Sequence, residues 1–207
     1  MSELKLAGFL ARSSVNGPGI RAVVWVQGCP IRCSGCFNSR LLSFSGGRTV
    51  QPGDLAEKIL ALDNIDGVTF SGGEPFAQAA PLAELGTLLR SSGLSVVTFT
   101  GFTWDQIISR HRRSWRRLLS VTDLLIAGPF VNRTVMTMDS SPAHTGKRGI
   151  WLCEGEPANG PDICEPADYT VCTEIEFTIR RDGQTIVTGF PGHRLVTELA
   201  ANSEVQL

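Results

Sequence analysis

The sequence predicts an α/β fold with a parallel sheet, and three observations support this prediction. Short apolar runs rich in β-branched residues alternate with segments of helical periodicity between residues 22 and 127. Proline, glycine and capping residues mark the ends of these segments. The chain has 207 residues, 42% of them hydrophobic, which suits one globular domain. Strands that alternate with helices are typical of parallel strands joined by right-handed crossovers.

Four strands are predicted from continuous apolar runs. Residues 22–27, Ala-Val-Val-Trp-Val-Gln, have the composition of a strand that is buried on both faces. Similar runs follow at 67–71, 94–100 and 122–127. We expect these four runs to lie side by side in the sheet.

Three helices are predicted in the intervals between these strands. Apolar residues recur at helical spacing after Pro52. They recur again from Pro81 to Ser92, where Gly93 supplies a C-terminal cap. The third helix begins at the capping box Thr103-Trp104-Asp105-Gln106. The order of elements is therefore β, loop, α, β, loop, α, β, α, β.

The pattern changes after residue 130. Residues 139–172 are rich in Pro, Gly, Ser and acidic residues and predict a long surface excursion. Alternating apolar and polar residues over 174–190, with a turn at Asp182-Gly183, predict a β-hairpin that covers an edge of the sheet. From Val196 onward we expect a short helix or a frayed tail. Residues 1–207 are expected to form a single domain with its core at about 16–130.

Charge and composition exclude some functions. The net charge is −1, so the chain lacks the basic excess of a nucleic-acid-binding protein. No apolar run approaches the roughly 18 residues of a membrane span, and the start of the chain does not look like a secretory signal. We therefore expect a cytoplasmic protein that binds neither nucleic acid nor membrane. Its six cysteines are then ligands, catalysts or packing residues rather than disulfide partners.

Three of the six cysteines lie in one loop. Cys29, Cys33 and Cys36 directly follow the first predicted strand, where parallel α/β folds place their chemistry. Three thiolates can hold three irons of a [4Fe–4S] cluster, one thiolate per iron. The fourth iron then keeps an open position for a substrate or a cofactor, as catalytic zinc sites do.

Other readings of these cysteines stay open. Cys33-Ser34-Gly35-Cys36 has the C-x-x-C spacing of a thioredoxin-like redox motif, although Cys29 would then have no role. A zinc site would need a fourth thiol, from Cys153, Cys164 or Cys172. Inert packing is the usual explanation of scattered cysteines, but it explains three in eight residues poorly. The loop favours the iron–sulfur cluster.

A second motif follows the second strand. In Ser71-Gly72-Gly73-Glu74-Pro75, two glycines permit close approach of backbone to a ligand, and a carboxylate can accept from an ammonium group. A plain turn between strand and helix is the alternative.

The Cys-x3-Cys-x2-Cys spacing is the signature of the radical S-adenosylmethionine superfamily, and this loop resembles it. The Gly-Gly-Glu segment resembles the part of that superfamily that holds the amino group of S-adenosylmethionine. The resemblance implies a partial (βα) TIM-like barrel with a C-terminal β-hairpin. It also implies a [4Fe–4S] cluster on Cys29, Cys33 and Cys36, and S-adenosyl-L-methionine at Phe37, Gly72, Gly73, Glu74, Thr98, Thr100 and Asp123. Ordinary packing or strand roles are nearly as plausible for Phe37, Thr98, Thr100 and Asp123.

The resemblance also implies a reaction. In this superfamily the amino and carboxylate groups of S-adenosylmethionine chelate the open iron, and an electron from the cluster cleaves a sulfur–carbon bond. The 5′-deoxyadenosyl radical so formed abstracts a hydrogen atom. The cofactors carry this chemistry, so no separate catalytic side chain is expected.

Several segments look like the activating proteins of anaerobic ribonucleoside-triphosphate reductase. These segments are 36–38, 100–103, 123–130 and 188–191, and residues 16–21 look like the entry segment of glycyl-radical-enzyme activases in general. The resemblance implies an enzyme that generates a glycyl radical on a partner enzyme and takes its electron from a donor such as flavodoxin.

Two departures leave the partner open: Pro30-Ile31-Arg32 replaces a common histidine, and the family's Gly-Ser-x-Asn-Gln stretch is not recognisable. The alternatives are a radical S-adenosylmethionine enzyme that modifies a peptide or small molecule, and a non-catalytic metal- or redox-binding module.

Two further features are expected to have no chemistry. Cys153, Cys164 and Cys172 are widely spaced and are predicted to be free thiols. The basic run from Arg110 to Arg117 is predicted to be a solvated face rather than a docking site for an acidic partner.

Overall fold

The structure is a computed structural model that describes residues 2–130 together with strands at 148–152, 163–164, 175–179, 185–189 and 205–206. Within these residues the main sheet has eight strands in the order β3-β1-β2-β4-β5-β6-β7-β8. They are β1 (Leu4–Ser13), β2 (Arg21–Val26), β3 (Arg48–Val50), β4 (Gly67–Gly72), β5 (Ser95–Thr100), β6 (Leu124–Ala127), β7 (Arg148–Leu152) and β8 (Ile163–Cys164).

The centre of the sheet is parallel, as the sequence predicts. Strand β2 pairs in parallel with β4, β4 with β5, and β5 with β6. These four strands match the four predicted apolar runs. Antiparallel strands flank them, because β1 pairs with β2 on one side and β7 pairs with β6 on the other. The prediction of an α/β fold with a parallel sheet is therefore confirmed.

The predicted helices are confirmed and a fourth is added. The helices are α1 (Pro52–Leu60), α2 (Ala79–Ser91), α3 (Trp104–Ser109) and α4 (Arg113–Leu119), with 3-10 turns η1 (Ser39–Leu41) and η2 (Pro75–Gln78). The Thr103 capping box forms as predicted, with Gln106 as its second member. Gly93 ends α2 with a φ of 85°, a conformation that favours glycine. Helix α4 is new, and its buried residues Trp115, Leu118 and Leu119 lie in the run predicted only as a charged face.

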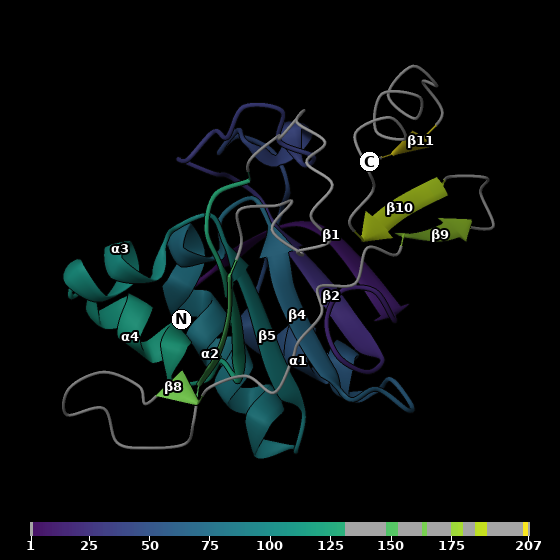
Figure 1. Ribbon diagram of the computed structural model, residues 1–207. Coiled ribbons are helices and arrows are strands. Elements are labelled where there is room, and N and C mark those ends of the chain that lie inside the picture. Colours follow the sequence, from purple (N-terminus) through teal and green to yellow (C-terminus); the bar gives the residue numbers. More distant parts are fainter. Residues whose placement is uncertain are drawn as a thin grey trace, which may run out of the picture.

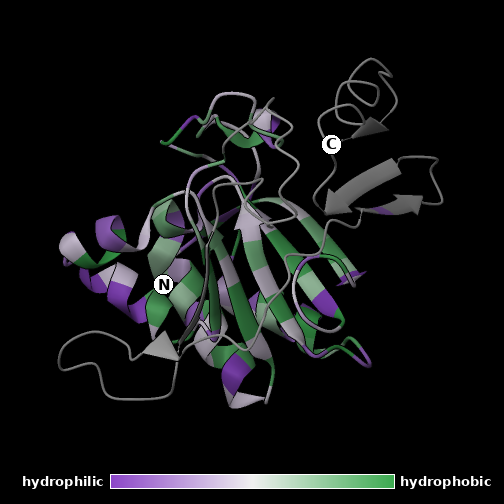
Figure 2. Cartoon of the chain, in the orientation of Figure 1, coloured by the Kyte–Doolittle hydropathy of each residue, from purple (hydrophilic) through white to green (hydrophobic). Residues whose placement is uncertain are grey.

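The helices gather on one face of the sheet (Figure 1). Strands β2, β4, β5 and β6 follow one another in chain order, so right-handed crossovers carry every connecting helix to the same side. The large core cluster on this face includes Val24, Phe70, Leu85 and Leu118. A smaller buried cluster of Val97, Leu124 and Ile126 forms separately. Figure 2 shows the hydrophilic residues of α3 and α4 in purple at the margin of the molecule.

Three predictions made from the sequence need correction. The first strand, β1, lies in a segment for which no strand was predicted. Strand β7 extends the main sheet from inside residues 139–172, which were predicted to be a surface excursion. The hairpin is confirmed as β9 (Ile175–Ile179) and β10 (Thr185–Gly189), but with β11 (Val205–Gln206) it forms a separate three-stranded sheet. It therefore does not pair with an edge of the main sheet. The remainder of the excursion and of the tail lies outside the described residues.

Within the described residues no helix combines enough length with enough apolar character to cross a bilayer.

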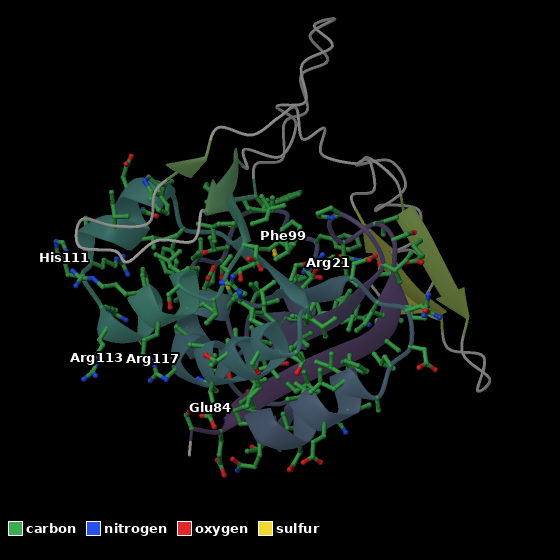
Figure 3. All side chains as sticks on the ribbon, turned by 90° about the horizontal axis from the view of Figure 1, so that it is seen from below. Arg21, Glu84, Phe99, His111, Arg113 and Arg117 are labelled. Atoms are coloured by element: carbon green, nitrogen blue, oxygen red, sulfur yellow. The ribbon has the colours of Figure 1, made fainter. Side chains whose placement is uncertain are left out.

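A buried arginine ties together the N-terminal ends of three parallel strands. Arg21 is only 1% exposed. Its guanidinium donates to the Val68 and Ser95 carbonyls at 3.0 and 2.7 Å, and to the Thr69 hydroxyl at 3.1 Å. It also reaches the Pro18 carbonyl at 2.9 Å. One side chain of β2 therefore binds β4, β5 and the segment before β2, and Figure 3 shows it inside the body of the molecule.

Two glycines leave the space that Arg21 fills. A Cβ on Gly17 would lie 3.0 Å from Cδ of Arg21, and a Cβ on Gly67 would lie 2.4 Å from its guanidinium and 2.1 Å from the Ser95 carbonyl oxygen. Gly17 and Gly19 also have φ values of 127° and 76°, which favour glycine, as the chain turns toward β2.

We predict that Arg21→Met lowers the free energy of unfolding by about 3 kcal/mol, because buried carbonyl and hydroxyl acceptors lose their donor. Urea unfolding measured by circular dichroism tests this. Arg12→Met is the matched control: the exposed Arg12 guanidinium donates to one carbonyl, that of Asp63, so its loss is expected to cost less than about 1 kcal/mol. Equal effects of the two substitutions would contradict the assigned role of Arg21.

Candidate functional site

The cysteine loop begins at the C-terminal end of β2. Hydrogen bonds between its first residues and residues 41–42 close it at its base. The Gly28 N–H donates to the Leu41 carbonyl at 2.9 Å, and the Cys29 N–H donates to the Leu42 carbonyl at 3.1 Å. These two bonds bring residues thirteen positions apart together. The loop therefore stands above the arrowheads of the parallel strands (Figure 1).

The three cysteines have different environments within this loop. Cys29 is buried at 7% exposure, whereas Cys33 and Cys36 are partly exposed, and all three are free thiols. The Cys36 N–H donates to the Cys33 carbonyl at 3.2 Å and forms a tight turn. Arg32 and Gly35 have positive φ values of 53° and 69° that allow the loop to reverse.

Burial raises the pKa of the Cys29 thiol. Hydrogen bonds from the backbone of Arg32 and Ile31 lower this pKa to a smaller extent, and the negative charges of Glu74 and Cys33 raise it further. Cys29 therefore keeps its proton at neutral pH until a metal displaces it, because only the thiolate is a ligand.

The Gly-Gly-Glu segment packs directly against the base of the cysteine loop. The Gly73 N–H donates to the Val26 carbonyl at 2.8 Å, and the Glu74 N–H donates to the Gly28 carbonyl at 2.9 Å. A Cβ on Gly73 would lie 2.3 Å from the Gly28 carbonyl oxygen, too close for any real contact. Only glycine permits this approach, so the two predicted motifs form one unit.

Asn38 adds a side-chain link between the same two segments. Its Nδ2 donates to the Gly72 carbonyl at 3.3 Å. Asn38 was not among the predicted site residues, although it directly follows Phe37. Its position two residues after the last cysteine of the loop is the feature of the sequence that could have indicated a role at the site.

The Glu74 carboxylate is engaged inside the protein. It is 1% exposed, and Oε1 accepts from the Phe76 N–H at 2.9 Å and from the Thr100 hydroxyl at 2.8 Å. Oε2 accepts from the Gly101 N–H at 2.9 Å. The side chain thus fixes the start of η2 and the end of β5. Toward a ligand the segment offers its backbone instead, since the Gly73 carbonyl accepts no hydrogen bond from the described residues.

The other predicted cofactor residues divide into two groups. Thr100 contacts Glu74 and therefore lies at the site, and Phe37 lies half-buried in the turn after Cys36. Thr98 is fully buried and shares a 2.9 Å hydrogen bond with Thr122, which places it in the packed interior.

Asp123 lies at the opposite end of the sheet from the cysteines. It precedes β6, accepts from the Val96 N–H at 2.7 Å and pairs with Arg90 at 3.2 Å. The structure does not bring it together with the other predicted residues, because parallel strands β5 and β6 both begin at that end.

A cleft of about 350 Å³ adjoins the site. Its walls come from the cysteine loop, the segment after β5, helix α3 and the segment after β6, and the residues are Pro30, Ile31, Gly101, Phe102, Thr103, Gln106, Arg110 and Pro129. Sequence analysis did not identify this cleft. Three of its four walls follow strand ends, which is the only signal that could have indicated it.

The donor set fits a [4Fe–4S] cluster, because each thiolate of such a cluster binds a different iron and three free thiols lie in one loop. Among the described residues no group of three or more His, Cys, Asp or Glu side chains converges on one metal ion. The side chains of Cys153, Cys164 and Cys172 lie outside the described residues, so their predicted free state stays a prediction.

Comparison with known proteins points to the same chemistry. Residues 15–151 match the model of the family described as 4Fe-4S single cluster domain. The chain is 32% identical over 118 residues to a pyruvate formate-lyase-activating enzyme of Clostridium pasteurianum, a match that covers 54% of this chain and 46% of that protein.

Two further relatives carry similar names. The pyruvate formate-lyase-activating enzyme of Streptococcus mutans is 31% identical over 119 residues, covering 55% of this chain and 45% of its own length. The pyruvate formate-lyase 1-activating enzyme of Escherichia coli K12 is 31% identical over 130 residues, covering 59% and 50%. The chain spans about half the length of these curated relatives. The resemblance to activating enzymes of glycyl-radical enzymes is thereby confirmed.

We predict that Gly73→Ala separates the cysteine loop from the Gly-Gly-Glu segment, because the new methyl group collides with the Gly28 carbonyl. Overpacking of this kind costs about 1–3 kcal/mol. The free energy of unfolding in urea and the iron content after anaerobic reconstitution should both decrease.

Gly53→Ala is the matched control, since no atom lies within 4 Å of its new Cβ. Alanine in helix α1 should leave iron content unchanged and raise stability by up to about 1 kcal/mol. Full iron content in Gly73→Ala would contradict the claim that the two segments form one unit.

Proposed function

We propose, from the premise that the chain belongs to the family of 4Fe-4S single cluster domains, that it is a radical S-adenosylmethionine enzyme. In this proposal Cys29, Cys33 and Cys36 bind one [4Fe–4S] cluster, and the backbone of Gly72–Glu74 binds S-adenosylmethionine beside it. The product is a glycyl radical on a partner protein.

One observation carries this proposal. Two backbone hydrogen bonds, of 2.8 and 2.9 Å, join the Gly-Gly-Glu segment to Val26 at the end of β2 and to Gly28 at the base of the three-thiol loop. Three thiols leave one iron of a cluster without a protein ligand, and the adjoining segment presents the Gly73 carbonyl as an acceptor. An amino acid that chelated the open iron through its amino and carboxylate groups would donate an N–H of its neutral amino group to this carbonyl.

The residues of the chain have separate tasks in this proposal. When bound and reduced, the cluster supplies the electron that cleaves the sulfur–carbon bond of S-adenosylmethionine. Cys29 loses its proton on metal binding and remains shielded from water by its burial. Glu74 keeps the ends of β4 and β5 in register through Thr100 and Gly101. Phe37, in the turn after Cys36, contributes an aromatic face for the nucleoside.

The fold is proposed to be a partial (βα) barrel of the radical S-adenosylmethionine type, in one domain. The sequential order of the four parallel strands and the placement of helices on one face support this. A doubly wound sheet would reverse its strand order and cover both faces.

The partner is proposed to be a glycyl-radical enzyme of the anaerobic ribonucleotide reductase kind. The names of the relatives refer to pyruvate formate-lyase, so they support a glycyl-radical enzyme as the partner without pointing to the reductase. The segments 36–38, 100–103 and 123–130 support the reductase in particular. We further propose a cytoplasmic location and a flavodoxin-like electron donor.

We predict that replacing any one of Cys29, Cys33 and Cys36 by alanine abolishes the visible iron–sulfur absorption and the formation of 5′-deoxyadenosine. The assay is anaerobic, with S-adenosylmethionine as substrate and dithionite as reductant. Cys164→Ala is the control and should retain both properties, because it is predicted to be a free thiol.

Two results would overturn the proposal. If the iron content is unchanged by all three substitutions, the cluster does not bind to this loop. If the unmodified protein binds iron but forms no 5′-deoxyadenosine, it does not catalyse the proposed reaction, and a non-catalytic metal-binding module is favoured.

A further inference from the structure

Five exposed arginines lie close together on α3 and α4 without internal counterions. We call Arg110, Arg112, Arg113, Arg116 and Arg117 the arginine surface; all five are exposed. None of the five has a carboxylate partner in the described part of the chain. This exposure agrees with the solvated face that the sequence predicts, but it leaves unexplained why the charges share one sign.

Aromatic packing holds part of the arginine surface in place. Trp115 is 3% exposed and contacts the rings of Phe76 and Phe102, with centroids 5.1 and 4.9 Å apart. The Arg110 guanidinium lies 4.9 Å from the Phe102 ring centroid and 5.5 Å from that of Trp115. Arg112 lies 5.2 Å from Trp115. These cation–π contacts position the charges and leave the guanidinium donors available to a partner.

The remaining arginines project from α4 into solvent. Arg113 and Arg117 are one helical turn apart, and Figure 3 shows both pointing away from the body of the molecule. Arg116 donates to Nδ1 of His111 at 2.8 Å. Like charges one turn apart destabilise a helix, so the arrangement is unfavourable until an anionic partner neutralises it.

The arginine surface is continuous with the cleft beside the cysteine loop. Arg110 belongs to both, because it lines the cleft together with Pro30, Ile31 and Gly101. Gly101 in turn donates to Glu74, which is part of the candidate site. If a segment of a partner protein entered this cleft, the neighbouring surface of that protein would contact the arginine surface.

From this we infer that the arginine surface docks an acidic face of the protein on which the site acts. The inference rests on the proposed function, because it assumes a protein substrate. Planar guanidinium groups bind carboxylates in a bidentate manner, and complementary charge steers the encounter. A nucleic acid is the less favoured occupant, since the chain carries no overall basic excess and its net charge is −1.

The test compares two double variants that each remove two positive charges. Arg113→Gln with Arg117→Gln alters the arginine surface. Arg48→Gln with Lys58→Gln is the control, on exposed positions of β3 and α1. The probe is a short fluorescent poly-L-glutamate, and its binding to the reconstituted protein is measured by anisotropy at low salt. We expect the first variant to weaken binding about tenfold, as two exposed charge pairs allow, and the control to change it less than about twofold.

A second arm identifies the occupant. With dithionite as reductant and anaerobic ribonucleotide reductase as substrate, the glycyl-radical signal should decrease in the first variant and not in the control. Formation of 5′-deoxyadenosine without the reductase should be equal in all three proteins. If that product is absent from every protein, the proposed function fails, whereas equal radical yields with normal 5′-deoxyadenosine refute the docking surface alone.

Three other outcomes would overturn the inference. Equal loss of poly-L-glutamate binding in both variants would show a nonspecific charge effect. Tighter binding of a single-stranded oligonucleotide of equal charge would assign the surface to nucleic acid. A defect that occurs only when flavodoxin replaces dithionite would assign it to the electron donor.

Discussion

The whole site depends on one close backbone contact, in which Gly73 and Glu74 hydrogen-bond to the chain at the end of β2. Neighbouring parallel strands normally end with side chains between them. Here the missing Cβ of Gly73 allows the loop after β4 to lie against the Gly28 carbonyl, at a distance that no other residue tolerates. The contact joins two separate loops, so that the three thiols lie next to a segment whose Gly73 carbonyl accepts no hydrogen bond from the described residues.

Buried charged groups fix both ends of the parallel strands. At the C-terminal ends the Glu74 carboxylate accepts three hydrogen bonds, from Phe76, Thr100 and Gly101. At the N-terminal ends the Arg21 guanidinium donates to carbonyl and hydroxyl groups of β4 and β5. Each charge is satisfied by dipoles and hydroxyl groups, and each binds segments that are distant in the sequence. The rigid strands between them hold the cysteine loop in a constant position relative to the cleft.

The sequence predicted the features that depend on local pattern. The four parallel strands, three helices and the Thr103 capping box follow from periodicity and capping chemistry, which need no knowledge of tertiary contacts. Strand β1 was missed because its alternation is broken by a register shift between Leu6 and Gly8. Helix α4 was missed because arginines on its exposed side obscure the apolar residues around Trp115.

The candidate site was predictable in its residues but not in their roles. The cysteines and the Gly-Gly-Glu segment lie together because both follow parallel strands. The sequence cannot show that the Glu74 carboxylate is already occupied, because its partners Thr100 and Gly101 lie more than 25 positions away. Asp123 was misplaced for a related reason: a residue adjacent to a strand can lie at either end of it, and Asp123 pairs with Arg90 at the far end.

The central claim is that three thiols leave one iron open to an amino acid held by the neighbouring backbone. Mössbauer spectroscopy of the protein reconstituted with ⁵⁷Fe, before and after addition of S-adenosylmethionine, tests it most directly. The account predicts that three of four irons keep the signature of complete sulfur ligation, while one iron changes on addition of S-adenosylmethionine. Four equivalent irons that do not respond to S-adenosylmethionine would contradict it.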